Sequence, residues 1–142
     1  MAANSLRGTV MTSQPLYILL CSGEHEKIQM AAMMASVGAV SDRAVHVFVS
    51  MNALFAFDRQ AAAEDRYKGG AFSDLIKGKN VPDAMQLFEQ GKMLGDLKIY
   101  VCSMALDVSG WGEDRLIEGL FDDAMGLTKF LSDAEGGQFV TL

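Results

Sequence analysis

The sequence contains very little cysteine. Only Cys21 and Cys102 occur among its 142 residues, and they lie far apart. Two distant thiols exclude a disulfide framework and the paired spacing of a zinc ribbon. The two histidines, His25 and His46, could complete a zinc site with them only if four distant segments converged. We therefore expect no metal and no cofactor, and each thiol has to be judged separately.

An excess of basic residues is also missing. The chain has 12 Lys and Arg against 18 Asp and Glu, which gives a formal net charge of −6. A surface of this charge repels a phosphate backbone unless a basic patch is present, and no run of Lys and Arg supplies one. The composition thus excludes nucleic acid as the default partner.

Long apolar runs are absent too, because polar residues interrupt every apolar stretch well before the ~20 residues that span a bilayer. Residues 1–15 contain one Arg and no continuous apolar core, so they are typical of a short flexible tail rather than of a secretory signal. We therefore expect a soluble cytoplasmic protein that does not contact a membrane, in a compartment where thiols stay reduced.

What the sequence does contain is the composition of one globular domain, over residues 16–142. Half of the residues are hydrophobic and 21% are charged. Strands that alternate with helices predict an α/β fold, with a mainly parallel open sheet of about five strands and helices on both faces. The predicted strands are 16–21, 44–50, 97–102 and 138–142, and the predicted helices are 24–40, 51–57, 80–95 and 113–134.

Several element boundaries carry their own signals. Ser22 is a candidate N-cap for the first long helix. Pro82 fits the first turn of the helix that Gly95 ends. Gly119 and Asp122 are positions at which the last predicted helix could break into two pieces.

Two segments stand out in this pattern. The helix at 24–40 is apolar nearly all round, because Met33, Met34 and Val37 lie outside its main apolar stripe. We expect the sheet to bury one side of it and a partner subunit to bury another. Residues 58–80 are polar, with three glycines and no sustained period, which predicts a long internal loop with at most a turn or two of helix. Such loops often form lids or mobile segments.

Both cysteines end predicted strands, Cys21 the first and Cys102 the third. Ligands of open α/β sheets bind outside the carboxyl ends of the strands. A thiol there can lie near backbone amides that favour the reactive thiolate. The alternative is inert packing, since free Cys is among the most buried residue types. Position alone makes inert packing the more common outcome and favours Cys102 over Cys21 as a reactive thiol.

The residues that follow the third strand, CSMALDVSGWG, read as an apolar loop. They resemble the DsrE/DsrF/DsrH-like family, in particular its branch with a Cys-x-Met-x-x-Asp-x-x-Gly pattern after a strand. Weaker similarity elsewhere extends the resemblance over about residues 16–142. The residues that carry it are Cys102, Met104, Asp107 and Gly110 on the pattern, Trp111 beside it, Ser22 and Gly23 after the first strand, and Asn80 to Pro82.

The resemblance implies a three-layer flavodoxin-like domain that assembles into homo-oligomers, often trimers or hexamers. It also implies a role in sulfur relay, in which the thiolate of Cys102 takes a sulfane sulfur, as a persulfide or thiosulfonate, and passes it to a TusA-like carrier protein. Such transfer needs an accessible thiol and room for a partner, but no metal. Segment 58–80 departs from the family, which often has Met- and Gly-rich residues there, and Cys21 is not part of the pattern.

Other side chains allow competing interpretations. Asp107 opposes a nearby thiolate by its charge, and we expect its carboxylate to cap the loop backbone instead. His25 could pair with Cys21, but it is more typical of a solvated residue at a helix start. His46, in the middle of a strand, predicts a half-buried side chain with satisfied hydrogen bonds. Residues 22–25 are too few and too acidic to cradle a phosphate, which argues against FMN or a nucleotide.

Two functional hypotheses follow. The first is a cysteine-based sulfur carrier, or a sulfurtransferase if it is catalytic, centred on Cys102. The second is a non-catalytic oligomeric domain that binds a small ligand or a protein at the carboxyl edge of the sheet, with Cys102 as part of the wall. A carrier must expose its thiol to a partner, at least through a channel, so the depth of Cys102 distinguishes the two.

Overall fold

The computed structural model of the chain describes residues 13–142, so most of the tail predicted for residues 1–15 lies outside the described residues. Five strands form one open sheet in which all neighbouring strands are parallel. This confirms the predicted α/β fold. The strand order is β4-β3-β2-β1-β5, with β1 Leu16–Leu20, β2 Val45–Val49, β3 Leu97–Cys102, β4 Asp123–Met125 and β5 Gln138–Thr141.

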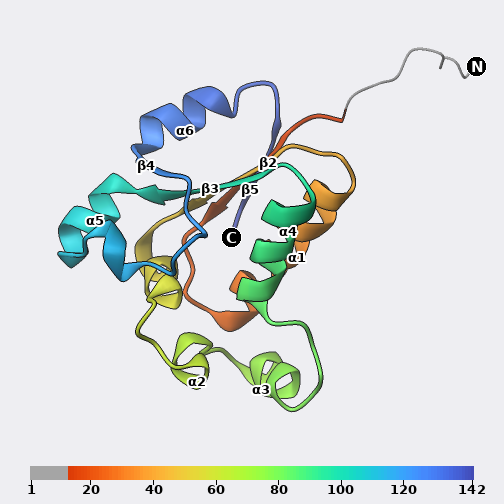
Figure 1. The fold of residues 1–142 in the computed structure, drawn as a ribbon, viewed down its shortest axis with the longest axis vertical. Helices are drawn as coiled ribbons and strands as arrows, with labels where there is room; N and C mark the ends of the chain where they lie inside the picture. Colours follow the sequence, from red (N-terminus) through yellow and green to blue (C-terminus); the bar gives the residue numbers. More distant parts are fainter. Residues whose placement is uncertain (1–12) are drawn as a thin grey trace, which may run out of the picture.

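Helices cover both faces of the sheet and give the domain three layers (Figure 1). α1 (His25–Val40) and α4 (Ala84–Leu94) lie side by side on one face, and α6 (Leu127–Asp133) lies on the other. The connection from β4 to β5 runs back across the sheet, so a right-handed crossover places α6 opposite α1 and α4. The shorter helices are η1 Met51–Phe57, α2 Ala63–Arg66, α3 Ala71–Lys77, α5 Ser103–Ser109 and η2 Glu113–Arg115.

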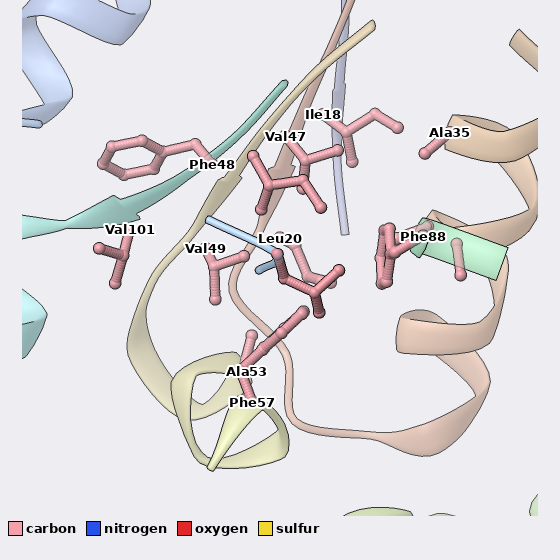
Figure 2. Close-up of a cluster of buried hydrophobic side chains, with 14 of the residues drawn as sticks. Ile18, Leu20, Ala35, Val47, Phe48, Val49, Ala53, Phe57, Phe88 and Val101 are labelled. Carbon is pink, nitrogen blue, oxygen red and sulfur yellow. The ribbon is translucent and has the colours of Figure 1, made fainter. Parts of the chain in front are cut away.

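Alternate residues of each strand face the two helical layers. Ile18 and Val47 are fully buried on the side of α1 and α4. On the other side, Tyr17 and Phe48 pack against the ring of Phe130 in α6, with ring centroids 5.5 and 4.9 Å away. Figure 2 shows this division, with Ile18 directed toward α1 and Phe48 directed away from it.

α1 is buried on the side that faces the sheet, as predicted, and it also packs against α4. Its opposite side is open in the single chain, where Met30, Met33, Val37 and Val40 expose between 44% and 66% of their surface. No helix between residues 13 and 142 combines the length and apolar character that a bilayer span requires.

The single helix predicted at 113–134 is wrong, because the chain forms η2, β4 and α6 there. The helical pattern fails at the two positions where a break was foreseen. Gly119 adopts a left-handed φ of +83°. The backbone amide of Asp122 donates to the carbonyl of Ile99, and its carboxylate accepts from the Ile99 amide, both at 2.8 Å. These bonds tie the chain to β3, so a short parallel strand forms in place of a helix.

Two further boundaries differ from the prediction. Residues 103–109, expected as a loop, form α5. α4 starts later than predicted, because Asp83 is its N-cap and accepts hydrogen bonds from the amides of Met85 and Gln86 at 3.1 and 3.2 Å. Pro82 therefore precedes the cap rather than lying in the first turn, whereas the predicted end of the helix at Gly95 is confirmed.

Segment 58–80 contains more helix than predicted, since both α2 and α3 lie in it. Glu26 of α1 holds the segment, because its Oε2 accepts from the amides of Gly70 and Ser73 at 2.9 and 3.0 Å. Tyr67 is buried, and its hydroxyl accepts from the Met85 amide at 3.3 Å. The segment is therefore packed against the starts of α1 and α4.

Candidate functional site

The carboxyl ends of the parallel strands place three small polar side chains in one row. Cys102 is the last residue of β3, Ser50 directly follows β2, and Cys21 directly follows β1. The residue before each of them is paired in the sheet, Leu20 with Val49 and Val49 with Val101. Cys21, Ser50 and Cys102 therefore lie side by side on neighbouring strands. Because side chains alternate along a strand, all three lie on the α6 face of the sheet. The structure thus brings both thiols to one edge, with a hydroxyl between them.

The two thiols differ in exposure. Cys102 is buried, with 4% of its surface exposed, whereas Cys21 is half-buried. Burial raises the pKa of the Cys21 thiol, and the neighbouring Cys102 raises it further. The two residues lie two strands apart, and each strand spacing is about 4.8 Å. Their separation therefore exceeds the Cα–Cα distance of about 7 Å beyond which a disulfide cannot form. The pair is therefore not positioned to form a disulfide.

An apolar hollow opens two residues after Cys102, between η1 and α5, with a volume of about 340 Å³. Four of its side chains, Met51, Phe55, Met104 and Val108, expose between 48% and 79% of their surface. Large apolar groups are thus uncovered at the edge where open α/β sheets bind ligands. The apolar hollow is lined by Met51, Asn52, Leu54, Phe55, Met104, Ala105, Val108 and Ser109.

A more polar hollow of about 550 Å³ adjoins the first, because Asn52 and Phe55 line both. Ser22 and Gly23 lie in its wall. Gly23 is needed for this close packing, since a Cβ there would lie 2.9 Å from the carbonyl oxygen of Asn52. The predicted residues Ser22, Gly23 and Met104 therefore gather around η1.

The other residues of the Cys-x-Met pattern lie on α5 and in the turn after it. Asp107 is exposed. Its backbone carbonyl accepts a hydrogen bond from the amide of Gly110 at 3.3 Å. This differs from the expected cap by the carboxylate. Gly110 ends α5 with a left-handed φ of +73°. The Trp111 ring lies 5.6 Å from the Phe55 ring, and the Arg115 guanidinium lies 4.7 Å from its centre. Trp111 therefore braces the turn after α5 against η1.

The backbone amides at the start of α1 are bonded within the chain. Glu24 takes the N-cap position predicted for Ser22, whose Oγ accepts from the Glu24 amide at 3.0 Å. The His25 amide donates to the carbonyl of Lys68 at 2.9 Å. These two donors are occupied by protein acceptors, so this helix start presents few amides to a phosphate.

His25 is buried rather than solvated, so that expectation is wrong. It exposes 2% of its surface, and its Nδ1 lies 2.7 Å from the Ser73 hydroxyl. Its ring stacks on Tyr67 at 4.5 Å. Burial, with a smaller effect of Lys77, lowers the pKa of His25. The ring is therefore engaged by segment 58–80 and is a structural contact.

His46 is half-buried with a hydrogen-bond partner, as predicted. Its Nδ1 lies 3.1 Å from the Tyr100 hydroxyl, and its ring stacks on Tyr17. Within the described part of the chain, no three His, Cys, Asp or Glu side chains are arranged to hold a metal ion.

Two residues at this edge, Ser50 and Met51, were not predicted to belong to the site. Ser50 is buried, and Met51 adopts a left-handed φ of +52°. The rule that singled out the cysteines, a polar residue directly after a buried strand, applies equally to Ser50. The left-handed backbone of Met51 could not be predicted from the sequence, because a methionine gives no indication that its φ is positive.

No family model and no curated protein matches the sequence. The chain is similar in structure to MTH1491 of Methanobacterium thermoautotrophicum, a protein of unknown function. The two share a TM-score of 0.62 and 15% sequence identity, over 92% of this chain and 100% of the other. An identity this low concerns the fold alone. The structural similarity agrees with the five-stranded parallel sheet between two helical layers. The chain is a three-layer, flavodoxin-like α/β domain.

Proposed function

We propose that the protein is a sulfur carrier that takes sulfane sulfur on Cys102 and passes it to a partner. The observation that carries the proposal is the place of Cys102, at the carboxyl edge of the sheet and next to the apolar hollow. The likeness of Cys102, Met104, Asp107 and Gly110 to the DsrE/DsrF/DsrH-like pattern supports it.

The chemistry requires only the thiolate and a persulfide donor. The Cys102 thiolate attacks the terminal sulfur of the donor, R–S–SH, and a new S–S bond forms at Sγ. The sulfur–sulfur bond of the donor breaks, and its electron pair leaves with R–S⁻. Cys102 then holds the sulfane sulfur as –S–SH, and an acceptor thiolate repeats the same step in the opposite direction. Atoms and electrons balance without an oxidant.

Because Cys102 is buried, the chain around it has to open for a partner to reach the thiol, and we propose that α5, which begins directly after Cys102, is the segment that moves. α5 is seven residues long and buries Ala105 and Leu106, whereas Met104 and Val108 are exposed. A short helix with so few buried side chains opens locally at low cost in free energy. Burial between exchanges would protect a persulfide from water and small thiols.

The proposal extends to partners and compartment. A TusA-like carrier protein is the expected acceptor, docked at the apolar hollow. The exposed apolar side of α1 is the proposed contact of a homo-oligomer, a trimer or a hexamer. A cytoplasmic location would keep both thiols reduced.

The proposal is tested by the mass of the intact protein after incubation with glutathione persulfide. Cys21→Ser should gain one sulfur atom that a reductant removes, and Cys102→Ser should gain at least tenfold less. Circular dichroism checks that both variants are folded. Equal sulfur gain by the two variants would remove Cys102 from the proposal.

A second candidate function, non-catalytic binding at the apolar hollow, is favoured by the 4% exposure of Cys102. In that case Cys102 is part of the wall, and an apolar ligand or side chain occupies the hollow. Thiol labelling of the native protein separates the two functions. A carrier labels Cys102 through local opening, whereas a binding domain labels it only when the whole protein unfolds.

A further inference from the structure

Ser50 lies next to Cys102 at the carboxyl edge. Ser50 directly follows β2, which is the strand adjacent to β3. Val49 is paired with Val101, and Ser50 and Cys102 are the next residues of the two strands. Neighbouring strands are about 4.8 Å apart. Because alternate side chains share a face, the Ser50 hydroxyl and the Cys102 thiol project to the same side of the sheet.

The Ser50 hydroxyl is buried, with 4% of the residue exposed. Ser50 occupies the N-cap position of η1, where a serine oxygen ordinarily accepts from a helix amide. No such capping bond is made. The hydroxyl is therefore not used by η1, and the register places Cys102 on one side of Ser50 and Cys21 on the other.

The backbone holds Ser50 in place. Its amide donates to the carbonyl of Leu20 at 3.0 Å, which continues the hydrogen-bond ladder of β2 with β1. The next residue, Met51, has a φ of +52°, a left-handed conformation that costs a non-glycine residue about 1 kcal/mol. Strain of this kind concentrates at functional sites, where the surrounding structure maintains it. Here it turns the chain sharply into η1 immediately after the hydroxyl.

We infer that Ser50 is the hydrogen-bond donor that stabilises the anionic sulfur of Cys102. Its O–H donates to Sγ when the thiol ionises, and to the persulfide anion after sulfur has been taken up. The hydroxyl keeps its proton throughout, so no other group has to accept one. A hydrogen bond to a charged group is stronger than one to a neutral thiol, so the contact favours the ionised form. The catalytic consequence rests on the proposed function of Cys102, whereas the effect on ionisation does not.

The test measures the thiolate fraction of Cys102 from its ultraviolet absorbance across pH. Every chain carries Cys21→Ser, so that one thiol remains, and the chain without both cysteines is the blank. Ser50→Ala should lower the thiolate fraction about tenfold at a fixed pH on the rising part of the curve. Uptake of sulfur from glutathione persulfide should slow by a similar factor.

Two comparisons separate the hydroxyl from packing. Ser50→Thr and Ser50→Val have nearly the same volume and differ in the hydroxyl, so Thr should titrate like the parent and Val like Ala. Ser36→Ala is the matched control, because Ser36 is also a buried serine, in α1, away from this edge. It should leave the titration unchanged. Thermal melting of every variant is recorded, and the Thr and Val pair decides the outcome if Ser50→Ala does not fold.

The inference is overturned if Ser50→Ala titrates like the parent, if Thr and Val shift equally, or if Ser36→Ala produces the same shift. Sulfur uptake on Cys102 that Ser50→Ala leaves unchanged would also overturn it, while the carrier proposal stands. A parent protein that takes up no sulfur, but whose thiolate depends on Ser50, would remove the carrier proposal and leave this inference in place.

Discussion

Residues of the Cys-x-Met pattern contribute to the structure in different ways. Gly110 is explained by its backbone, because a left-handed φ of +73° ends α5, and glycine adopts this conformation at little cost. Trp111 is explained by packing against Phe55. Met104 is exposed and lines the apolar hollow, so packing does not account for it. The fold therefore explains Gly110 and Trp111, whereas a role for Cys102 and Met104 in sulfur transfer belongs to the proposed function.

His25 should make stability depend on pH. Burial lowers its pKa below the ordinary 6.5, so the unfolded chain binds a proton at a higher pH than the folded protein does. Stability is therefore lost as pH falls through about 6.5 toward the lower pKa of the folded state. His25→Gln should reduce the difference in unfolding free energy between about pH 7 and about pH 5, as measured by urea denaturation.

His46 should contribute in the same way, because burial also lowers its pKa. His46→Gln should remove its own share of the pH dependence, and the double variant should remove both. An unchanged pH dependence in His25→Gln would mean that its pKa is not lowered by burial.

Among the elements, the buried strands and the short helix η1 could be predicted from sequence, whereas α5 and β4 could not. Four strands lie within a residue or two of their predicted positions, because a short apolar run has few alternatives in an α/β pattern. β4 was missed, because its residues Asp123–Met125 have no apolar run and are held by hydrogen bonds from Asp122 to Ile99. For the candidate site, the position of Cys102 could be predicted because the apolar run before it indicates where the strand ends. Its other parts depend on register, as for Ser50, or on backbone strain, as for Met51.

Segment 58–80 depends on one side chain of α1 for its attachment. Glu26 accepts hydrogen bonds from two amides of the segment, at Gly70 and Ser73. Glu26→Ala should loosen the segment, because both amides lose their acceptor. Limited trypsin digestion should then cut after Lys68 severalfold faster than in the parent. In both proteins this cut should precede cleavage at Lys98 in β3.

Glu24→Ala is the matched control, since Glu24 is exposed and its side chain makes one weak ion pair, to Lys27 at 3.9 Å. It should leave the cleavage rate unchanged. Equal acceleration by the two variants, or first cleavage in β3, would show that Glu26 does not hold the segment.

For the whole molecule, the open side of α1 is an apolar surface that a single chain leaves uncovered. We expect the homo-oligomer to bury it. Met33→Glu combined with Val37→Lys should lower the mass in solution to that of a monomer, because charges at these positions would oppose burial of the contact. Sedimentation velocity measures the result. Leu131→Glu, at an exposed position of α6 on the opposite face, is the control and should keep the mass of the parent.

An oligomer that survives the changes at Met33 and Val37, or a parent that is already monomeric, would assign no assembly role to this side of α1. Loss of assembly in Leu131→Glu instead would place the contact on the α6 face.

A parallel sheet brings all its carboxyl ends to one edge, which is how residues 21, 50 and 102, far apart in sequence, come to form a row. We propose that Cys102 in this row holds sulfur that can be passed on. The most direct measurement loads the Cys21→Ser protein with a heavy sulfur isotope, removes the donor, adds an acceptor thiol and follows the intact mass of both. We expect the labelled sulfur to leave Cys102 and to appear on the acceptor, atom for atom, while the protein stays folded. Label that fails to load, or that remains on Cys102 until the protein unfolds, would contradict it.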